Sequence, residues 1–375
     1  MTADLPQNRL VSLDTFRGIT IASMMLVNYP GDWSHVYSPL LHAQWNGWTP
    51  TDWIFPFFLF IMGVAMPLSR QRSGEGGADK KRLWIKIIRR TLVLFGLGLF
   101  LSGYPSFNWG TMRIPGVLQR IAVCYFALSA IVMLSRNKRD EWLAMGGLIL
   151  LYFGIMWGVD VPEYGRGILT AEGHAGGLMD RLILGREHIW QARSYDPEGT
   201  VSTLPAILSA FLGLQFGRVL IKHQDHQARI NKWLLYSATL MFMGLVADNL
   251  IIPVNKQLWT PSYAILMGGI GGFLLTVTYW IIDVKGYQNW SRLFAMMGMN
   301  PLFIFWSSGF LVRTLMITKI DTAAGEKSLW SLLYLKGWGA MLPAYPASLA
   351  FALTNVAFWL LVGWVMYRRR WFVKI

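Results

Sequence analysis

The sequence predicts an all-α membrane protein that crosses the bilayer many times. Of its 375 residues, 54% are hydrophobic and only 14% are charged, whereas charged residues make up about 25% of an ordinary globular chain. Apolar runs of about 20 residues recur along the whole chain, and a helix of that length crosses a hydrocarbon core of about 30 Å. Together these observations exclude a soluble enzyme.

Ten apolar segments are long enough to be membrane helices. The shorter apolar segment 328–342 carries Lys336, which favours a re-entrant or interfacial helix over a full span. We therefore treat residues 1–375 as one transmembrane domain. Its helices are expected at 10–29, 52–69, 87–104, 115–134, 142–159, 202–221, 233–252, 261–282, 293–312 and 347–367.

The distribution of basic residues predicts the orientation of these helices. With the N-terminus inside, 23 of the 34 Lys and Arg fall in the segments predicted to be cytoplasmic. Cytoplasmic loops of membrane proteins carry such an excess of positive charge. The sequence thus predicts ten helices with both termini in the cytoplasm, and one long outer loop at about 160–201 that could act as a lid or a substrate platform.

The net charge of +14 does not indicate nucleic-acid binding, because the basic residues lie in short loops between apolar runs. The single cysteine, Cys124, lies in an apolar run, so an intramolecular disulfide is excluded. His223 and His226 have no accompanying carboxylate cluster and are interpreted as loop residues. No metal site is predicted.

A histidine and a carboxylate flank the turn that leads into the second helix. Thr49 or Thr51 could cap that helix, and Asp52 falls in its first turn, where a negative charge suits the helix dipole. A carboxylate near a histidine can orient the ring and stabilise its protonated form, which makes His42 a candidate general base. A surface or capping role for His42 is the alternative.

Three further polar features lie in the predicted helices. Asp14 and Arg17 are three residues apart and share one helical face, which favours a structural pair that fixes the helix. Asn28 lies at the outer end of the first helix. Asn300-Pro301 should kink or break the ninth helix, as is common at membrane-embedded sites.

Taken together, the motifs resemble those of the heparan-α-glucosaminide N-acetyltransferase family, specifically its shorter bacterial members without a lumenal domain. The matching stretches run in the family's order from residue 14 to about residue 300. They include DTFRG at 14–18, VNY at 27–29, HAQWNG at 42–47, RIPGVLQR at 113–120, DPEG at 196–199, PVNK at 253–256 and DVKG at 283–286.

The resemblance implies transfer of an acetyl group from cytosolic acetyl-CoA to an amino sugar on the far side of the membrane. In this family the histidine at the position of His42 is taken as catalytic and the asparagine at the position of Asn28 as its partner. The interval between them is a few residues longer here than in the animal enzyme. A free or short glucosamine-containing sugar is the expected acceptor, in a bacterial inner membrane.

Amide formation from a thioester needs a base and a donor to the developing oxyanion. We assign His42 as the base, Asp52 as its orienting carboxylate and Asn28 as the oxyanion donor. Acetylation of His42 itself is an alternative route. The candidate sugar contacts are Trp45 and Asn46 of the HAQWNG motif, the acidic Asp196 and Glu198, and Asn255 and Lys256; for the last four, loop architecture is an equal alternative.

The nucleotide end of CoA carries several negative charges, which basic residues can bind. The candidates on the cytoplasmic rim are Arg70, Arg89 and Arg90, although membrane topology explains these cations equally well. Arg113 and Arg120 belong to the RIPGVLQR motif and could line a central channel or pair with Asp52. Asn300, at the break in the ninth helix, completes the set of cofactor candidates.

Two other functions are compatible with the sequence. Ten helices with a broken ninth helix would suit a secondary transporter of amino sugars or small acids, although no clear internal repeat is evident. An O-acyltransferase acting on a polysaccharide would use the same histidine on a hydroxyl group. The sequence leaves open whether the protein forms a homodimer.

Overall fold

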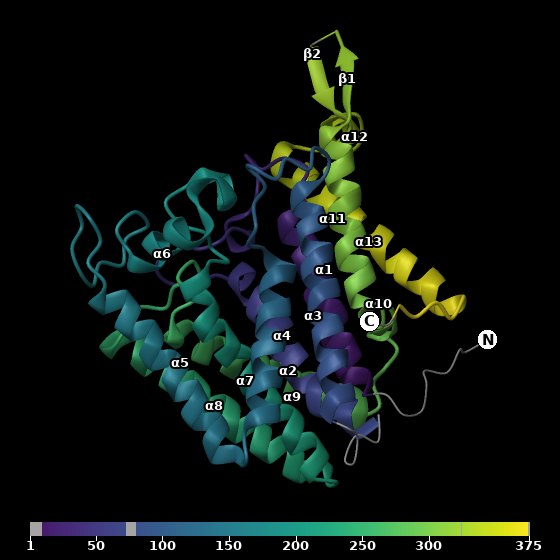
Figure 1. The fold of residues 1–375 in the computed structure, drawn as a ribbon. Helices are drawn as coiled ribbons and strands as arrows, with labels where there is room; N and C mark the ends of the chain where they lie inside the picture. The colour runs from purple at the N-terminus through teal and green to yellow at the C-terminus, as the bar shows by residue number, and fades with distance from the viewer. Residues whose placement is uncertain (1–9, 73–79, 324, 374–375) are drawn as a thin grey trace. The chain divides into compact units, whose positions relative to one another are not determined.

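The computed structural model describes residues 10–72, 80–323 and 325–373, and almost all of its regular structure is helical (Figure 1). The described chain forms two compact units. The first contains Met1–His42, Thr49–Ile54 and Leu274–Ile375, and the second contains Ala43–Trp48 and Phe55–Phe273. Each unit is described separately.

The first unit is built around α1 (Val11–Asn28), which packs on α10 (Arg292–Gly298) and α13 (Ala344–Arg368). Two short 3₁₀ turns, η1 (Ser38–Leu40) and η2 (Pro50–Trp53), lie on either side of the HAQWNG motif. The unit also holds the π-helical turn η6 (Trp280–Val284), α11 (Pro301–Ile317), α12 (Leu329–Lys336) and η7 (Trp338–Ala340). A hairpin of β1 (Lys319–Thr322) and β2 (Gly325–Ser328) extends from the end of α11, with Lys319 paired to Ser328 (Figure 1).

The predicted break in the ninth helix is confirmed. α10 and α11 meet at an angle of 84° across Met299 and Asn300. Proline has no backbone N–H to continue a helix, but it suits the first turn of a new one. Pro301 therefore begins α11 where α10 stops.

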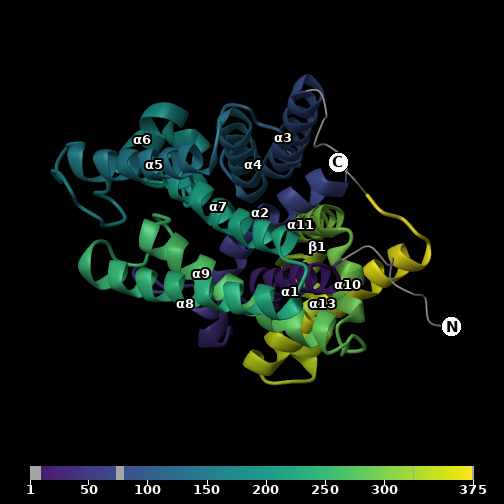
Figure 2. The ribbon, with the colours of Figure 1, turned by 90° about the horizontal axis from the view of Figure 1, so that it is seen from below.

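The second unit contains the remaining helices. In sequence order these are α2 (Ile54–Arg72), α3 (Lys80–Gly103), α4 (Val117–Leu134), α5 (Lys138–Gly158), α6 (Ala175–Leu184), the 3₁₀ turns η4 (Arg186–His188) and η5 (Trp190–Ala192), α7 (Thr200–Lys222), α8 (His226–Leu250) and most of α9 (Pro261–Tyr279). The buried α7 contacts α4, α5 and α6, and α5 and α6 lie beside it in Figure 2.

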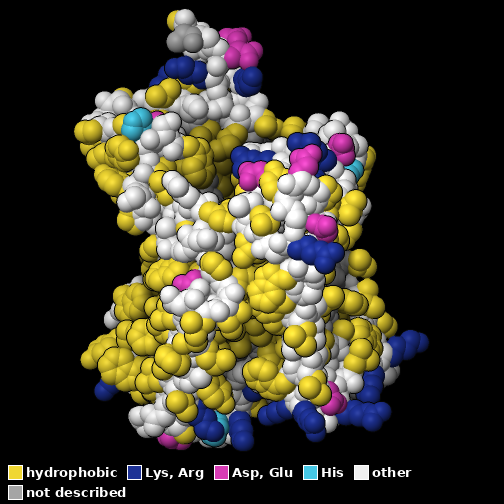
Figure 3. All heavy atoms as spheres, turned by 90° about the vertical axis from the view of Figure 1, so that its left-hand side faces the viewer, with side chains coloured by type: hydrophobic (Ala, Val, Ile, Leu, Met, Phe, Trp, Pro, Cys, Tyr) yellow, Lys and Arg dark blue, Asp and Glu magenta, His cyan; other side chains and the backbone are white. Residues whose placement is uncertain are grey.

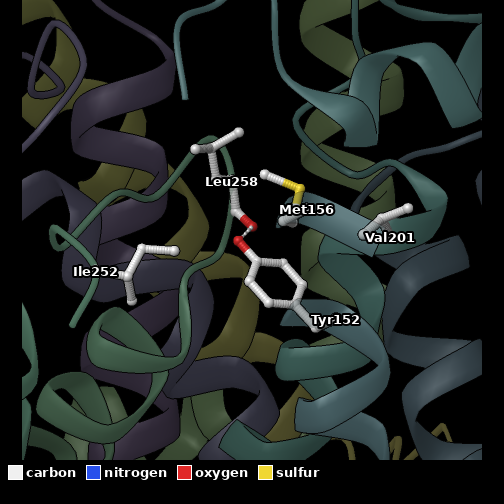
Figure 4. Close-up of a cluster of buried hydrophobic side chains, with 5 residues drawn as sticks. All are labelled: Tyr152, Met156, Val201, Ile252 and Leu258. Carbon is white, nitrogen blue, oxygen red and sulfur yellow. Dashed lines mark hydrogen bonds between the residues drawn. The ribbon is translucent and has the colours of Figure 1, made fainter. Parts of the chain in front are cut away.

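A core cluster joins α5, the start of α7 and the loop between α8 and α9. Tyr152, Met156, Val201, Ile252 and Leu258 are each at most 5% exposed (Figure 4). The Tyr152 hydroxyl donates to the Leu258 carbonyl at 3.3 Å. This contact satisfies the only polar group in the cluster's side chains and fixes the 253–260 loop against α5.

Each of the ten predicted segments coincides with a helix or, at 293–312, with the bent α10–α11 pair. Seven helices in the described residues are long and apolar enough to cross a membrane, and the bent pair makes eight. α1 and α3 are not among them, because α1 carries Asp14, Arg17 and Asn28 and the first half of α3 contains six basic residues. Large apolar side chains are exposed along α5 and α8, including Leu150 (72%) and Phe242 (69%), and hydrophobic side chains cover the middle of the face in Figure 3.

Candidate active site

The first unit places His42 against Asp52, as the sequence predicts. Nδ1 of His42 lies 2.6 Å from Oδ1 of Asp52. The carboxylate is almost fully buried, with 1% of its side chain exposed, whereas 43% of the His42 side chain is exposed. The pair therefore combines an inward-facing anion with a ring that reactants can reach.

Local hydrogen bonds hold the carboxylate in this position. Asp52 is the third residue of η2, and its Oδ2 accepts a hydrogen bond from the backbone N–H of Thr49 at 2.9 Å. The Thr49 hydroxyl donates to the carbonyl of Leu41 at 2.7 Å, next to His42. The Thr49-Pro50 turn thus ties the two members of the pair together, as expected for a helix start of this composition.

This geometry defines the chemical role of each ring nitrogen. An ionised carboxylate only accepts hydrogen bonds, so Nδ1 of His42 carries the proton that points to Asp52. Nε2 is then the nitrogen with a lone pair that can take a proton, and the buried carboxylate stabilises the imidazolium that results. The arrangement can act as a general base.

A second His–carboxylate pair lies in the same unit. Nδ1 of His35 is 2.7 Å from Oδ2 of Asp32, and both side chains are about one-third exposed. The hydrogen bond from His35 and that from the backbone of Ser34 lower the pKa of Asp32. This pair was not predicted from the sequence, although an Asp-x-x-His spacing in a loop could have revealed it.

Asn28 is the last residue of α1 and is exposed. Within the described residues, no hydrogen bond joins it to His42. Its side chain is therefore presented at the end of the helix without a role in holding the His42–Asp52 pair.

In the second unit, Asn46 and Asn255 come together. The Asn255 amide donates to Oδ1 of Asn46 at 3.1 Å, and its own Oδ1 accepts from the backbone of Leu258 at 2.9 Å. Gly47 N–H donates to the Val254 carbonyl at 2.8 Å. These hydrogen bonds link the HAQWNG motif to the PVNK motif. Both the amide nitrogen and the amide oxygen of Asn255 take part in hydrogen bonds.

Trp45 is held by the long loop that follows α5. Its indole N–H donates to the carbonyl of Leu169 at 2.8 Å, and its ring packs edge-to-face on Tyr195 at 5.6 Å. Lys256, next to Asn255, is half-buried. Trp45 therefore presents a fixed aromatic surface three residues along the chain from His42.

Asp196 and Glu198 are both paired with Arg113. The Arg113 guanidinium binds Asp196 with two hydrogen bonds of 2.6 and 2.8 Å and also donates to Glu198. Burial would lower the pKa of Arg113, but the hydrogen bonds and charges of the two carboxylates raise it above its ordinary value. Both carboxylates are therefore engaged by Arg113 within the unit.

Arg120 occupies a fully buried position on α4. It donates to the hydroxyl of Ser202 at 2.5 Å and to the carbonyl of Gly199 at 3.3 Å, and it lies over the ring of Trp259 at 4.9 Å. Its Nε and Nη1 have no hydrogen-bond partner among the described residues. Arg113 and Arg120 thus join the DPEG motif to the start of α4 instead of forming a free basic surface.

The comparison with known proteins agrees with these motifs. Residues 9–258 match the family model "Heparan-alpha-glucosaminide N-acetyltransferase, catalytic". The chain belongs to this family. It is 30% identical to the human heparan-alpha-glucosaminide N-acetyltransferase and 28% identical to the mouse one, in each case over 98% of this chain. It spans about 60% of the length of these relatives.

The family match covers His42, Asn28 and Asp52, but it ends before Asn300. Asn300 is buried, and its side chain bonds the carbonyl of Trp371 and the N–H of Val373, both at 2.9 Å. These bonds attach the C-terminal segment to the break between α10 and α11. The side chain of Asn300 therefore has a structural role in this fold.

The basic residues predicted on the cytoplasmic rim differ in their contacts. Arg90 lies over the ring of Tyr125 at 4.6 Å, and Arg89 is exposed on α3. The side chain of Arg70 lies outside the described residues. In the part of the chain that the structure describes, no group of three or more His, Cys, Asp or Glu could hold a metal ion.

Proposed function

We propose that this chain is a membrane N-acetyltransferase that moves acetyl from cytosolic acetyl-CoA to the amine of a glucosamine-type sugar on the periplasmic side. The observation that carries the proposal is the His42–Asp52 pair, with its buried carboxylate and accessible ring. Membership of the family supports the reaction class. We expect the acceptor group to be an amine, because a neutral histidine can take the proton that the attacking nitrogen loses.

The chemistry follows from the two ring nitrogens. The amine nitrogen attacks the thioester carbonyl carbon, and Nε2 of His42 takes the N–H proton while Asp52 stabilises the imidazolium. Asn28 donates to the developing oxyanion. The C–S bond then breaks, and the departing thiolate takes the proton back from His42.

A route through acetyl-His42 uses the same pair. Nε2 of His42 then attacks the thioester carbonyl carbon first, the C–S bond breaks, and CoA leaves as the thiol with the proton that the ring gives up. The amine next attacks the carbonyl carbon of the acetyl group, the bond from that carbon to Nε2 breaks, and the ring regains a proton from the amine. Rapid acid quenching with labelled acetyl-CoA in the absence of sugar distinguishes the routes, because only this route leaves label on the protein.

The sugar contacts divide into two kinds. Trp45 offers an apolar ring face, and Lys256 offers a donor, so we assign both to acceptor binding. Asn46 and Asn255 bond each other and are assigned to positioning that surface. Asp196 and Glu198 are held by Arg113, so we assign them to the architecture that supports the acceptor site.

The test is acetyl transfer by the purified full-length protein in detergent, using labelled acetyl-CoA and glucosamine. His42→Ala and Asp52→Asn should each lower kcat by about 10²-fold or more, because they remove the base or its orienting partner. Asn28→Ala should lower kcat by a similar factor by removing an oxyanion donor.

His35→Ala is the matched control, since it removes the histidine of the exposed His–Asp pair. It should keep wild-type transfer. If His35→Ala lost acetyl transfer and His42→Ala kept full activity, the proposed base would be His35 of the other pair. If alkali released the label from the product, the product would be an O-acetyl ester. If vesicles took up glucosamine and no acetylated product formed, the protein would be a transporter.

A further inference from the structure

A basic cavity lies in the second unit, at one end of α5, α7 and α8. Its volume is about 380 Å³, within the range of small-molecule sites. Its polar lining consists mainly of Lys138, Gln215, Arg218, Lys222, His223 and Lys232. None of these residues belongs to the proposed catalytic site.

Three positive charges in this cavity have no anionic partner in the part of the chain that the structure describes. Arg218 forms a bidentate ion pair with Glu141, at 2.5 and 2.6 Å, so its charge is compensated. Among the described residues, Lys138, Lys222 and Lys232 form no salt bridge. Like charges gathered around one cavity repel each other, and a bound anion would relieve that repulsion.

Two of these lysines act on the charge of His223, which also lines the cavity. Partial burial and the nearby charges of Lys232 and Lys222 all lower the pKa of His223. This shift favours the neutral ring of His223, so the lysines supply the positive charge.

One hydrogen-bond donor in the lining is buried and unused. Nε2 of Gln215 has no partner in the described part of the chain. Arg218 donates to the other atom of this amide, Oε1, at 3.4 Å, which fixes Nε2 as the donor. A buried donor without an acceptor is costly, and Gln215 lines the cavity, so a ligand oxygen that came beside this amide would stabilise it.

The surroundings indicate where such a ligand resides. Lys138 begins α5 and Lys222 ends α7, and both helices are candidate membrane spans. Leu143 and Leu235, further along α5 and α8, are each 63% exposed. The cavity therefore lies at the polar end of apolar helices, at the level where membrane phosphates are found.

We propose that this cavity binds a phosphate group, with the three lysines neutralising its charge and Gln215 donating to one of its oxygens. Two sources share that chemistry: the headgroup of an anionic phospholipid and the phosphates of a soluble nucleotide. The inference does not depend on acetyl transfer, because binding is measured without an acceptor.

The test compares wild type with the double variant Lys222→Gln/Lys232→Gln, as full-length protein in a neutral detergent. The probes are phosphatidylglycerol, phosphatidylcholine with the same acyl chains, and adenosine 3′,5′-bisphosphate. Lipid retention is followed by native mass spectrometry and nucleotide binding by equilibrium dialysis. Wild type should bind one of the anionic probes at least tenfold more tightly than the double variant does.

Two single variants separate the contribution of the Gln215 hydrogen bond from the effect of removing a lysine elsewhere. Gln215→Leu keeps every charge and should weaken the same probe by about three- to tenfold, the effect of one hydrogen bond. Lys336→Gln removes an exposed lysine on α12 and should change nothing. Unchanged elution and melting temperature show that the variants are folded.

Each outcome decides the proposal. If the double variant loses binding of phosphatidylglycerol alone, the cavity is a lipid site. If it loses binding of the bisphosphate alone, the cavity is a nucleotide site. Two results would overturn it. In the first, wild type and the double variant bind both anionic probes equally well. In the second, wild type retains phosphatidylcholine as well as phosphatidylglycerol and binds no bisphosphate.

Discussion

The two His–carboxylate pairs of the first unit have nearly the same hydrogen-bond length but different surroundings. Asp52 is 1% exposed, whereas Asp32 is 33% exposed. Water and salt screen the exposed pair, and such pairs contribute about 0–1 kcal/mol. The buried carboxylate of Asp52 is screened less, because it lies in a medium of lower dielectric constant. Burial of the carboxylate is therefore the difference between the pair that we propose as catalytic and the exposed pair.

A third histidine provides a prediction for pH dependence. His174 is 3% exposed, and burial followed by the charge of Arg181 lowers its pKa to about 4. Its Nδ1 accepts a hydrogen bond from Gly177 at the start of α6. The unfolded chain binds a proton near pH 6.5, so stability should fall as the pH is lowered from 6.5 towards 4, by up to about 3 kcal/mol.

The measurement is the melting temperature in detergent across this pH range. His174→Asn keeps a side-chain acceptor for the helix start but removes the titration, so its melting temperature should depend less on pH. Burial raises the pKa of the neighbouring Asp180, which acts in the opposite direction, and the comparison with His174→Asn separates the two. Parallel curves for the two proteins would contradict the assignment.

At the residue scale, short-range pairs could be predicted and long-range pairs could not. His42 and Asp52 are ten residues apart around a Thr-Pro turn, and Asp14 and Arg17 are three apart on one helix, joined at 2.8 Å as expected. Arg113 and Asp196 are 83 residues apart. Nothing in the local sequence of a charged residue tells which distant partner it meets, so Asp196 appeared free to bind a sugar.

At the scale of elements, the DTFRG motif explains how α1 meets α10. A Cβ on Gly18 would overlap the carbonyl oxygen of Phe294, and one on Gly298 would overlap that of Asp14. Arg17 donates to the carbonyl of Gly298 at 3.1 Å while it pairs with Asp14. The two glycines allow the backbones to touch, and the ion pair satisfies a carbonyl at the end of α10.

Replacing Gly18 should therefore separate these helices. Gly18→Ala should destabilise the protein by about 1–3 kcal/mol, because the backbones must move apart. Gly96→Ala on α3 is the matched control: its added methyl group meets nothing within 4 Å, and alanine favours a helix more than glycine does. Melting temperatures in detergent should fall for the first variant and stay equal or rise for the second. Equal shifts in both would show that the α1–α10 contact is not so close.

Helix positions were predictable because hydropathy reports which residues avoid water. The sequence also indicated the α10–α11 break through Asn300-Pro301. It did not reveal α6 within the 160–201 loop, because ten residues with Asp180 and Arg181 fall below the length and apolarity of a membrane span. Short helices of this kind depend on tertiary contacts, here with α5 and α7.

At the scale of the whole molecule, the main expectation concerns how often the chain crosses the bilayer. Length and apolarity support up to eight spans in the described residues. Our proposal of ten adds α1 and α3, with both termini in the cytoplasm. α3 has 24 residues and a length of about 36 Å, but its basic residues lie in its first half. Long basic side chains near a helix end can extend to the membrane surface, which allows such a helix to cross.

Three serines test these two helices with minimal change in shape. Ser34 follows α1, Ser106 follows α3 and Ser135 follows α4. Each is replaced by cysteine after Cys124→Ala, and intact cells are treated with a maleimide that cannot cross the membrane. Ten spans predict labelling at positions 34 and 106 and protection at 135, which becomes labelled once the cells are opened. The Cys124→Ala protein should stay unlabelled throughout. Protection of Ser106→Cys in intact cells would show that α3 does not cross, and protection of Ser34→Cys would show the same for α1 and would place His42 on the cytosolic side.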